Sequence, residues 1–335
     1  MNILRLEAML KSEPSYRMKQ IKHLLCVDLI THWDEATTLP KNLREQLQKE
    51  VKIELHYKLV EDKSGLTTKA LISLKDGLCI ESVLMKYNKR NTICLSSQVG
   101  CPVGCSFCAT GGMGYKRNLT AGEMILQVLL FARILKKEAK RISNVVFMGM
   151  GEPLLNYDNV IKAITFLSDK DGFNIGMRKI SVSTVGIISA LNELLVVLPN
   201  INIAISLHSA SQEIRNKLIP VSSKFSLDHI RAWIMKYFKE TNRKLMIEYV
   251  LLNEVNDSAK DARQLHNFVR KFPKNRYVIN LINYNDTGVY KPSSKERIEK
   301  FRKILENEGI PHTERFRFGR SIHAGCGQLA TRTTK

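Results

Sequence analysis

Short apolar runs alternate with amphipathic stretches along most of the chain. The apolar runs, rich in β-branched residues, span residues 92–99, 144–151, 179–186, 202–209, 244–252 and 277–285. Between them, residues 121–137, 227–240 and 294–309 carry apolar side chains at helical spacing. Six strand-then-helix units predict a parallel sheet with helices outside it, because mostly apolar strands are typical of a sheet buried on both faces.

Six such units fit either an open, doubly wound sheet or a partial (βα)6 barrel. In both folds, ligands bind at the carboxyl ends of the strands. Polar and glycine-rich positions fall at these ends: three cysteines after the first run, then Gly149–Glu152, Ser183–Gly186, Ser206–His208 and Asn285. The sequence therefore predicts one shared pocket.

The first 90 residues have a different pattern. Residues 14–26 and 41–51 show helical apolar spacing, with a proline near each predicted start. Two alternating runs within residues 68–87 flank Asp76-Gly77, a strong signal for a β-hairpin. We predict a small α+β accessory module at 1–90, which would bind RNA, an α/β core at 91–320, and a C-terminal loop with a basic tail at 321–335.

The charge balance indicates an anionic partner. The chain has 52 Lys and Arg against 32 Asp and Glu, a formal net charge of +20. Such an excess favours nucleic acid, although a protein that merely has a high pI is the alternative. The N-terminal apolar run is broken by Arg5, Glu7 and Lys11, and residues 124–135 are too short to span a bilayer. We expect a cytoplasmic protein without membrane attachment.

Three of the seven cysteines, Cys101, Cys105 and Cys108, form a Cys-x3-Cys-x2-Cys cluster. Clustered thiolates bind zinc or iron–sulfur clusters. A structural zinc site would need a fourth ligand, and Cys94 is a candidate, but it falls inside a predicted strand. The other interpretation is a four-iron cluster whose fourth iron is open to a substrate. An odd number of cysteines argues against a disulfide framework.

The cysteine spacing, with Phe107 before the last cysteine, resembles the signature of radical S-adenosylmethionine (SAM) enzymes. Longer motifs narrow the resemblance: CLSSQVGCPVGCSFCATGGMGYKRNLTAGEMILQV, VFMGMGEPLLNYDNV, SVSTVGI, AISLHS and AGCGQL. Together they closely resemble the RlmN/Cfr family of bacterial RNA methyltransferases, which methylate a ring carbon of adenosine. The resemblance covers nearly the whole chain and implies a partial (βα)6 TIM-type barrel with an N-terminal α+β accessory domain.

The resemblance also implies the cofactors. Cys101, Cys105 and Cys108 would hold a [4Fe–4S] cluster whose open iron chelates SAM, and an electron from the cluster would split SAM into methionine and a 5′-deoxyadenosyl radical. Gly151 and Glu152 match the loop that receives the methionyl amino group. The matches to contacts with the ribose, carboxylate and adenine of SAM are Ser183, Ser206, Leu207, His208 and Asn285.

Three further residues match the family's catalytic positions. Adenine's ring carbons are electron-poor and cannot attack a methyl sulfonium, so the family first methylates a cysteine, here Cys326. The radical takes a hydrogen from that S-methyl group, and the resulting carbon radical adds to the base. Cys94 then attacks the sulfur, which releases the product and leaves a transient disulfide. Glu81 matches the proposed proton acceptor, although without the resemblance it would be a surface carboxylate on a hairpin.

The expected substrate is carbon 2 of an adenosine in 23S rRNA, and in tRNA as well, and methylation of carbon 8 is the alternative. The stretch GEPLLN resembles the carbon-2 enzymes, while the carbon-8 resistance relative lacks that proline. The family's usual electron donor is flavodoxin, and we expect a monomer. Basic residues that could clamp RNA are Arg17, Lys19, Lys22, the run 86–90, Lys116, Arg117, Arg315, Arg317 and Arg320. The target adenosine must leave its stack, so a loop or folding intermediate is the expected RNA.

The chain departs from the family pattern at two places. Ser321 and Gly325 replace the usual residues before the catalytic cysteine, and Asp286 replaces a proline after Asn285. These changes put the timing of the C-terminal loop and the choice of RNA in question. A methylthiotransferase would need another N-terminal cysteine triplet and is set aside. The non-enzyme alternative is an RNA-binding module with a structural metal site.

Overall fold

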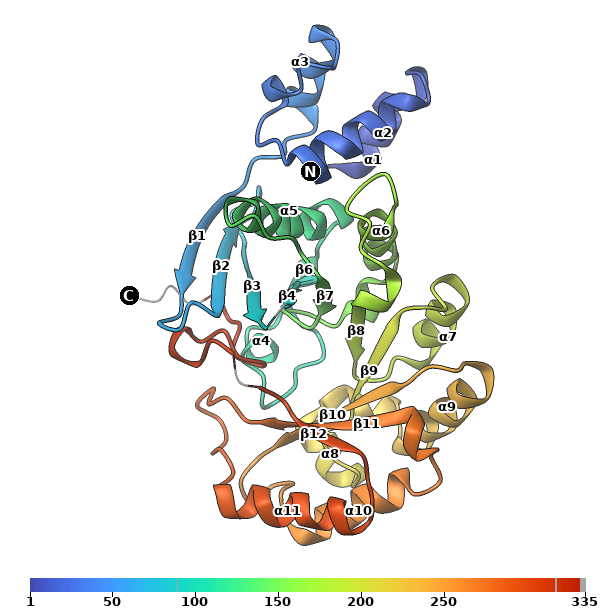
Figure 1. Ribbon diagram of the computed structural model, residues 1–335. Helices are drawn as coiled ribbons and strands as arrows, with labels where there is room; N and C mark the ends of the chain where they lie inside the picture. The colour runs from blue at the N-terminus through green and yellow to red at the C-terminus, as the bar shows by residue number, and fades with distance from the viewer. Residues whose placement is uncertain (89, 317, 332–335) are drawn as a thin grey trace.

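A sheet of ten strands organises the molecule (Figure 1). The computed structural model describes residues 1–88, 90–316 and 318–331. Within them the strand order is β1-β2-β3-β4-β7-β8-β9-β10-β11-β12. The parallel part consists of β4 (Arg90–Cys94), β7 (Asn144–Phe147), β8 (Ile180–Thr184), β9 (Asn202–Ser206), β10 (Leu245–Leu251), β11 (Tyr277–Asn283) and β12 (His312–Glu314).

The strand order decides between the two predicted topologies. Each parallel strand lies beside its predecessor, so every crossover moves in the same direction. A doubly wound sheet would reverse its strand order at a switch point. The partial barrel is therefore confirmed, and β12 adds one parallel strand to the six that the apolar runs predicted.

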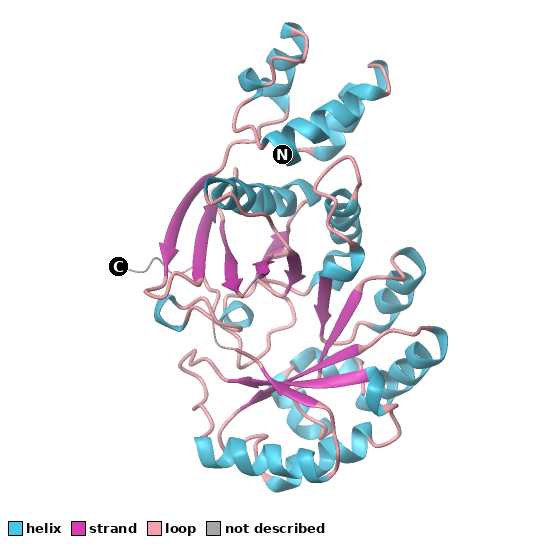
Figure 2. Cartoon of the chain, in the orientation of Figure 1, coloured by secondary structure: helices cyan, strands magenta, loops and turns pink. Residues whose placement is uncertain are grey.

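Helices cover the outer side of the parallel strands (Figures 1 and 2). They are α5 (Ala121–Lys137), α6 (Tyr157–Ser168), α7 (Ile188–Val197), α9 (Leu227–Glu240), α10 (Ala259–Val269) and α11 (Lys295–Asn307); the short helices α4 (Ala109–Gly112) and α8 (Gln212–Leu218) follow β5 and β9. The predicted helices at 121–137, 227–240 and 294–309 are confirmed. Helix α5 starts where expected because Thr120 and Glu123 form a capping box.

The N-terminal part begins with three helices and continues into the sheet. Helices α1 (Ile3–Met9), α2 (Tyr16–His23) and α3 (Lys41–Glu50) precede β1 (His56–Glu61), β2 (Thr67–Ser73) and β3 (Cys79–Tyr87). The predicted hairpin is confirmed as β2–β3, and β3 pairs antiparallel with β4. The hairpin therefore extends the sheet of the barrel, while the three-part division of the chain stays a prediction.

The expected strand at 92–99 is wrong in its second half. Strand β4 ends at Cys94, and Gln98–Gly100 (β5) pairs with Tyr115–Asn118 (β6) in a separate two-stranded sheet. The backbone N–H of Ser96 donates to the Gln127 side chain, and that of Ser97 donates to the Met150 carbonyl. These partners replace the strand ladder, so the chain leaves the main sheet just before the cysteine loop.

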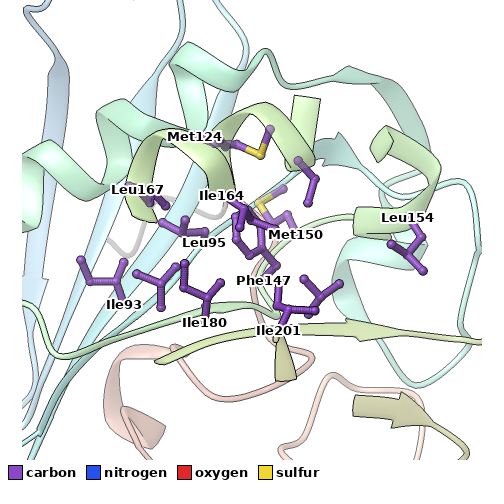
Figure 3. Packing of buried hydrophobic residues seen from close by; sticks show 14 of the residues in the cluster. Ile93, Leu95, Met124, Phe147, Met150, Leu154, Ile164, Leu167, Ile180 and Ile201 are labelled. Atoms are coloured by element: carbon purple, nitrogen blue, oxygen red, sulfur yellow. The ribbon is translucent and has the colours of Figure 1, made fainter. Parts of the chain in front are cut away.

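One continuous core connects the helices to the sheet. Figure 3 shows side chains from β4, β7, β8 and helices α5 and α6, among them Ile93, Phe147 and Ile164, packed against one another. Helix α5 is buried on most of its surface, because the N-terminal helices cover the side that faces away from the sheet. None of the helices in the described residues is long and apolar enough to cross a membrane.

Candidate active site

A cavity of about 200 Å³ lies at the carboxyl ends of the parallel strands. The predicted site residues that line it are Cys94, Cys101, Cys105, Cys108, Gly151, Glu152, Ser183, Ser206, His208, Asn285 and Cys326. They come from seven separate segments of the chain. The prediction of one shared pocket is confirmed, and of the predicted site residues only Glu81 and Leu207 lie outside its wall.

The three clustered cysteines lie on the loop between β5 and β6. Gly100 closes this loop with φ +74°, and a Cβ on it would lie 1.7 Å from the Gly114 carbonyl oxygen. The Cys101 N–H donates to that same oxygen at 3.1 Å. Only glycine fits this close approach of the two loop ends. The loop geometry thus depends on a residue outside the cysteine triplet.

The environment of these thiols suits a metal cluster. Burial raises the pKa of Cys101 to about 12 and also raises the pKa of Cys105. Such thiols stay protonated unless a bound cation compensates the thiolate charge. Among the described residues, no three His, Cys, Asp or Glu side chains lie close enough together to hold a single metal ion. An iron–sulfur cluster, in which cysteines bind different iron atoms, needs wider spacing than a single ion.

Glu152 is a buried carboxylate at the end of β7. Its Oε2 accepts from the Val185 N–H at 2.9 Å, and its Oε1 accepts from the Leu154 N–H at 3.1 Å. Burial raises the pKa of Glu152 to about 7, against these hydrogen bonds. Gly151 precedes it with φ +102°, and a Cβ there would lie 2.6 Å from the Gln98 side chain. The tight turn at Gly151 therefore places the Glu152 carboxylate.

The ends of β8 and β9 present polar groups to the same cavity. The Ser183 and Ser206 hydroxyls lie 3.1 Å apart. His208 is buried with φ +58°, and its Nδ1 accepts from the Val250 N–H at 3.1 Å. Burial, and then the charge of Arg215, lower the pKa of His208 to about 3. The imidazole is therefore neutral, with its proton on Nε2.

Arg215 ties these strand ends together, although no sequence pattern pointed to it. Its guanidinium is fully buried and donates to the carbonyl oxygens of Val185 at 2.7 Å and Leu207 at 3.2 Å. The Leu207 side chain is buried in the core, so only its backbone belongs to the strand end. The predicted contact of Leu207 with a ligand would have to use that backbone.

The C-terminal loop brings Cys326 to the cavity. The Gly327 carbonyl accepts from the Ala109 N–H at 2.8 Å, and the Leu329 carbonyl accepts from the Thr110 hydroxyl at 2.5 Å. The Asn285 amide donates to the Cys326 carbonyl at 3.2 Å. The loop is thus seated on α4, directly after the cysteine cluster, and its own cysteine remains exposed.

Glu81 lies in a second, smaller cavity of about 30 Å³. Its side chain is buried and forms an ion pair of 2.8 Å with Lys69, also buried. Its other oxygen accepts from the Ala330 N–H at 2.9 Å, and the Lys69 ammonium donates to the His323 carbonyl at 3.5 Å. The carboxylate therefore contacts the C-terminal loop, and its role as proton acceptor stays a prediction.

Arg315 belongs to the cavity rather than to an outer surface. It forms an ion pair of 3.5 Å with Glu248 and shares the cavity wall with Cys94 and Cys326. The charge that Cys326 would carry as a thiolate raises the pKa of Arg315, which remains a cation. Sequence analysis missed Glu248, but a carboxylate inside the apolar run 244–252 was an available signal.

Several predicted RNA-clamp residues have partners within the protein. Arg17 is buried beside Glu13, Lys22 pairs with Asp169 at 2.5 Å, and Arg117 pairs with Asp76 and Glu123. Two more, Lys89 and Arg317, lie outside the described residues. Among the predicted clamp residues, Arg90, which starts β4, and Arg320 are exposed.

Comparisons with known proteins agree with this geometry. Residues 95–266 match the model of the radical SAM superfamily. A protein of Dictyoglomus turgidum named "Probable dual-specificity RNA methyltransferase RlmN" is 41% identical over 319 residues, which cover 95% of this chain and 91% of the relative. "Ribosomal RNA large subunit methyltransferase N" of Nitrosopumilus maritimus is 39% identical over 329 residues, which cover 94% and 92%.

The structural comparison gives the same result over the whole fold. The crystal structure of a radical SAM methyltransferase from Sphaerobacter thermophilus superposes with a TM-score of 0.94 at 39% sequence identity, and the match covers 99% of this chain and 98% of that one. The cavity with its cysteine loop thus lies in a fold that is shared from end to end. The chain belongs to the radical SAM superfamily and, within it, to the RlmN family of RNA methyltransferases.

Proposed function

We propose that this enzyme methylates carbon 2 of an adenosine in 23S rRNA, and in tRNA as well, by way of an S-methylated Cys326. One observation carries the proposal. Two cysteines outside the cluster triplet, Cys94 and Cys326, line the same cavity as Cys101, Cys105 and Cys108. A methyltransferase that moved a methyl group directly from SAM to an electron-rich atom would need neither.

The chain's own residues fit the cofactors of the superfamily. Cys101, Cys105 and Cys108 would hold a [4Fe–4S] cluster, since their buried thiols need a cation to ionise. Glu152 offers a desolvated carboxylate for the amino group of SAM, because a cation is the partner that would compensate its charge. When bound, the cluster and SAM supply the methyl group and the one-electron chemistry.

The polar groups at the strand ends would orient SAM. Ser183 and Ser206 present two hydroxyls 3.1 Å apart, which suits the paired hydroxyls of a ribose. His208 is neutral, and its Nε2–H is a hydrogen-bond donor in the cavity wall. Asn285, which follows β11, contributes an amide to the same wall. These groups support contacts with the ribose, carboxylate and adenine.

The two lone cysteines would divide the covalent chemistry between them. Cys326 is exposed, so its sulfur can accept a methyl group as its proton is lost. After the methyl carbon has joined the base, Cys94 attacks the Cys326 sulfur. Cys94 loses its proton, the sulfur–carbon bond of Cys326 breaks, and the two sulfurs form a disulfide. The electron pair of the broken bond stays with the methylene carbon, which takes up a proton to become the product methyl group. An external donor, such as flavodoxin or a thiol, returns two electrons to that disulfide.

The substrate assignment rests on local sequence and on the relatives' names. Residues 151–156 (GEPLLN) form the turn that carries Glu152, and this stretch resembles the carbon-2 enzymes. The net charge of +20 favours a polyanion, and the relatives are named as RNA methyltransferases with ribosomal or dual specificity. Ribosomal RNA as substrate would locate the enzyme in the cytoplasm.

The test is nucleoside mass spectrometry of RNA treated anaerobically with the reconstituted enzyme, SAM and a reductant. We expect 2-methyladenosine in 23S rRNA and in tRNA. Formation of 8-methyladenosine would reject the carbon-2 assignment, and absence of both products with a four-iron cluster present would reject the adenosine assignment.

Cysteine variants test the covalent steps. Cys326→Ala should abolish methylation, and Cys94→Ala should accumulate protein covalently bound to RNA. Cys79→Ala is the matched control, because Cys79 lies at the start of β3 outside both cavities. Free methylated RNA formed at the wild-type rate by Cys94→Ala would refute the resolving role of Cys94.

A further inference from the structure

Three aromatic side chains from two distant segments pack together near the cavity. Tyr87 is the last residue of β3, whereas Phe316 and Phe318 follow β12. The ring centroids of Tyr87 and Phe316 lie 5.0 Å apart, and those of Phe316 and Phe318 lie 4.8 Å apart. We call these three residues the aromatic cluster.

The aromatic cluster is not an ordinary part of the core. Phe316 is 51% exposed and Tyr87 is 43% exposed. The spacing of the rings is that of favourable aromatic pairs, so the cluster keeps its shape while it presents ring surface to solvent. An ordered, exposed aromatic surface is a feature of binding sites rather than of hydrophobic cores.

The cluster is continuous with the active site. Phe316 and Phe318 line the large cavity together with Val83 and Met85 of β3. Tyr87 follows Val83 and Met85 at alternate positions, which face the same side of the strand. The aromatic surface therefore leads from the cavity wall outward to its rim.

Three arginines lie close to the aromatic cluster in strand register or in sequence. Arg90 is exposed and pairs in register with Tyr87 across β3 and β4. Arg320 is exposed two residues after Phe318, and Arg315 precedes Phe316 inside the cavity. A ligand that combines negative charge with flat aromatic faces is an unpaired segment of nucleic acid, in which phosphates meet the cations and bases meet the rings.

We propose that the aromatic cluster is a stacking platform for an unpaired base beside the target adenosine. The proposal rests on the proposed function, since the target base must leave its stack to enter the cavity. Its neighbour then loses a stacking partner, and a ring of the cluster replaces that partner. The platform contributes affinity for unpaired RNA without reading a particular sequence, because every base has a π-face.

The test compares leucine and tyrosine replacements in the holoenzyme without reductant. Phe316→Leu/Phe318→Leu keeps apolar side chains but removes two of the three rings, those that line the cavity, whereas Phe316→Tyr/Phe318→Tyr keeps all three rings. The probe is a short RNA stem–loop whose loop holds an adenosine next to 2-aminopurine, a base whose fluorescence is quenched by stacking. Fluorescence anisotropy gives the dissociation constant. Tyr57→Leu is the control, because Tyr57 is a 45% exposed tyrosine on β1 outside both cavities.

Loss of one stacked base should weaken binding by about fivefold or more in the leucine variant and should reduce the quenching of 2-aminopurine. The tyrosine variant and Tyr57→Leu should bind and quench like the wild type. The weakening should be equal at about 50 mM and about 200 mM salt, since stacking releases no counterions. Unchanged affinity and quenching in the leucine variant would overturn the proposal, and so would a loss that disappears at high salt.

These outcomes are separate from those of the methylation assay. If the wild type methylates RNA while the leucine variant binds the probe normally, only the platform is rejected. If the wild type forms no methyladenosine but the leucine variant loses stacking, the proposed reaction is rejected and the platform stands.

Discussion

Two glycines of the cysteine loop allow backbone strain and steric clash to be separated. Gly100 and Gly104 both have positive φ, +74° and +67°. A Cβ on Gly104 would meet nothing within 4 Å, whereas a Cβ on Gly100 would lie 1.7 Å from the Gly114 carbonyl oxygen. Replacement by alanine therefore adds a similar backbone penalty at both positions but adds a clash only at Gly100.

The magnitudes follow from these distances. An alanine in the left-handed region costs about 1–2 kcal/mol, which is the whole expected cost at Gly104. At Gly100 the new Cβ would also force the Gly114 carbonyl to move away, and this steric clash adds about 1–3 kcal/mol. That movement breaks the bond from the Cys101 N–H and leaves a buried donor unpaired, for another loss of about 1–3 kcal/mol. We expect Gly100→Ala to destabilise the loop by about 3–8 kcal/mol.

The assay is iron and sulfide content after anaerobic reconstitution, together with the visible absorbance of the cluster. Gly104→Ala should keep nearly the wild-type content, about four of each per chain for a [4Fe–4S] cluster. Gly100→Ala should lose most of it, because its cysteines no longer face one site. Wild-type iron content in Gly100→Ala would refute the reasoning, and equal losses in both variants would assign the effect to backbone strain alone.

Three further variants test other parts of the site. Lys69→Met leaves the buried Glu81 carboxylate unpaired and should lower the free energy of unfolding in urea by about 3–5 kcal/mol. Lys69→Met/Glu81→Met removes both charges and should lower it by less. A double variant that is less stable than the single variant would contradict this account. The folded state holds His208 neutral with a pKa of about 3, so His208 stabilises the fold above about pH 6.5 and this stabilisation is lost as the pH falls. The wild type should therefore lose about 2 kcal/mol of unfolding free energy through His208 between about pH 7 and pH 5, and His208→Asn should not show this loss. Equal dependence of the unfolding free energy on pH in both proteins would refute this prediction. Arg215→Met removes the hydrogen bonds that hold the ends of β8 and β9 together, so it should raise the dissociation constant for SAM about tenfold. An unchanged dissociation constant in calorimetry would exclude a role of Arg215 in positioning these strand ends.

The sequence predicted the features that depend on local pattern. Apolar runs located the six predicted parallel strands, and helical apolar spacing located α5 at residues 121–137. The pocket could be predicted because the carboxyl ends of parallel strands meet at one edge, whatever the side chains are. The choice of the barrel over the doubly wound sheet needed the strand order, which no local pattern encodes.

Features that depend on distant contacts escaped prediction. Strand β4 ends at Cys94 because Gln127, on a later helix, takes the Ser96 N–H. Glu81 looked like a surface carboxylate, but Lys69 on the neighbouring strand and the C-terminal loop bury it. Arg315 was assigned to the RNA surface because a basic residue carries no sign of the buried Glu248 that receives it. In each case the partner is far away in the sequence.

The different surroundings of the two lone cysteines fit different tasks. The pKa of Cys94 is raised to about 12, by burial first and then by the charge of a Cys326 thiolate, while Arg315 acts in the opposite direction. On the proposed function, Cys94 is thus held as an unreactive thiol as long as the Cys326 sulfur carries negative charge, and the exposed Cys326 sulfur would be the one that accepts the methyl group. Once Cys326 carries a carbon substituent, its sulfur has no charge, and Arg315 is left to favour the Cys94 thiolate. On the proposed function, alkylation of Cys326 would therefore favour the Cys94 thiolate, so that the resolving attack would follow transfer of the methyl group.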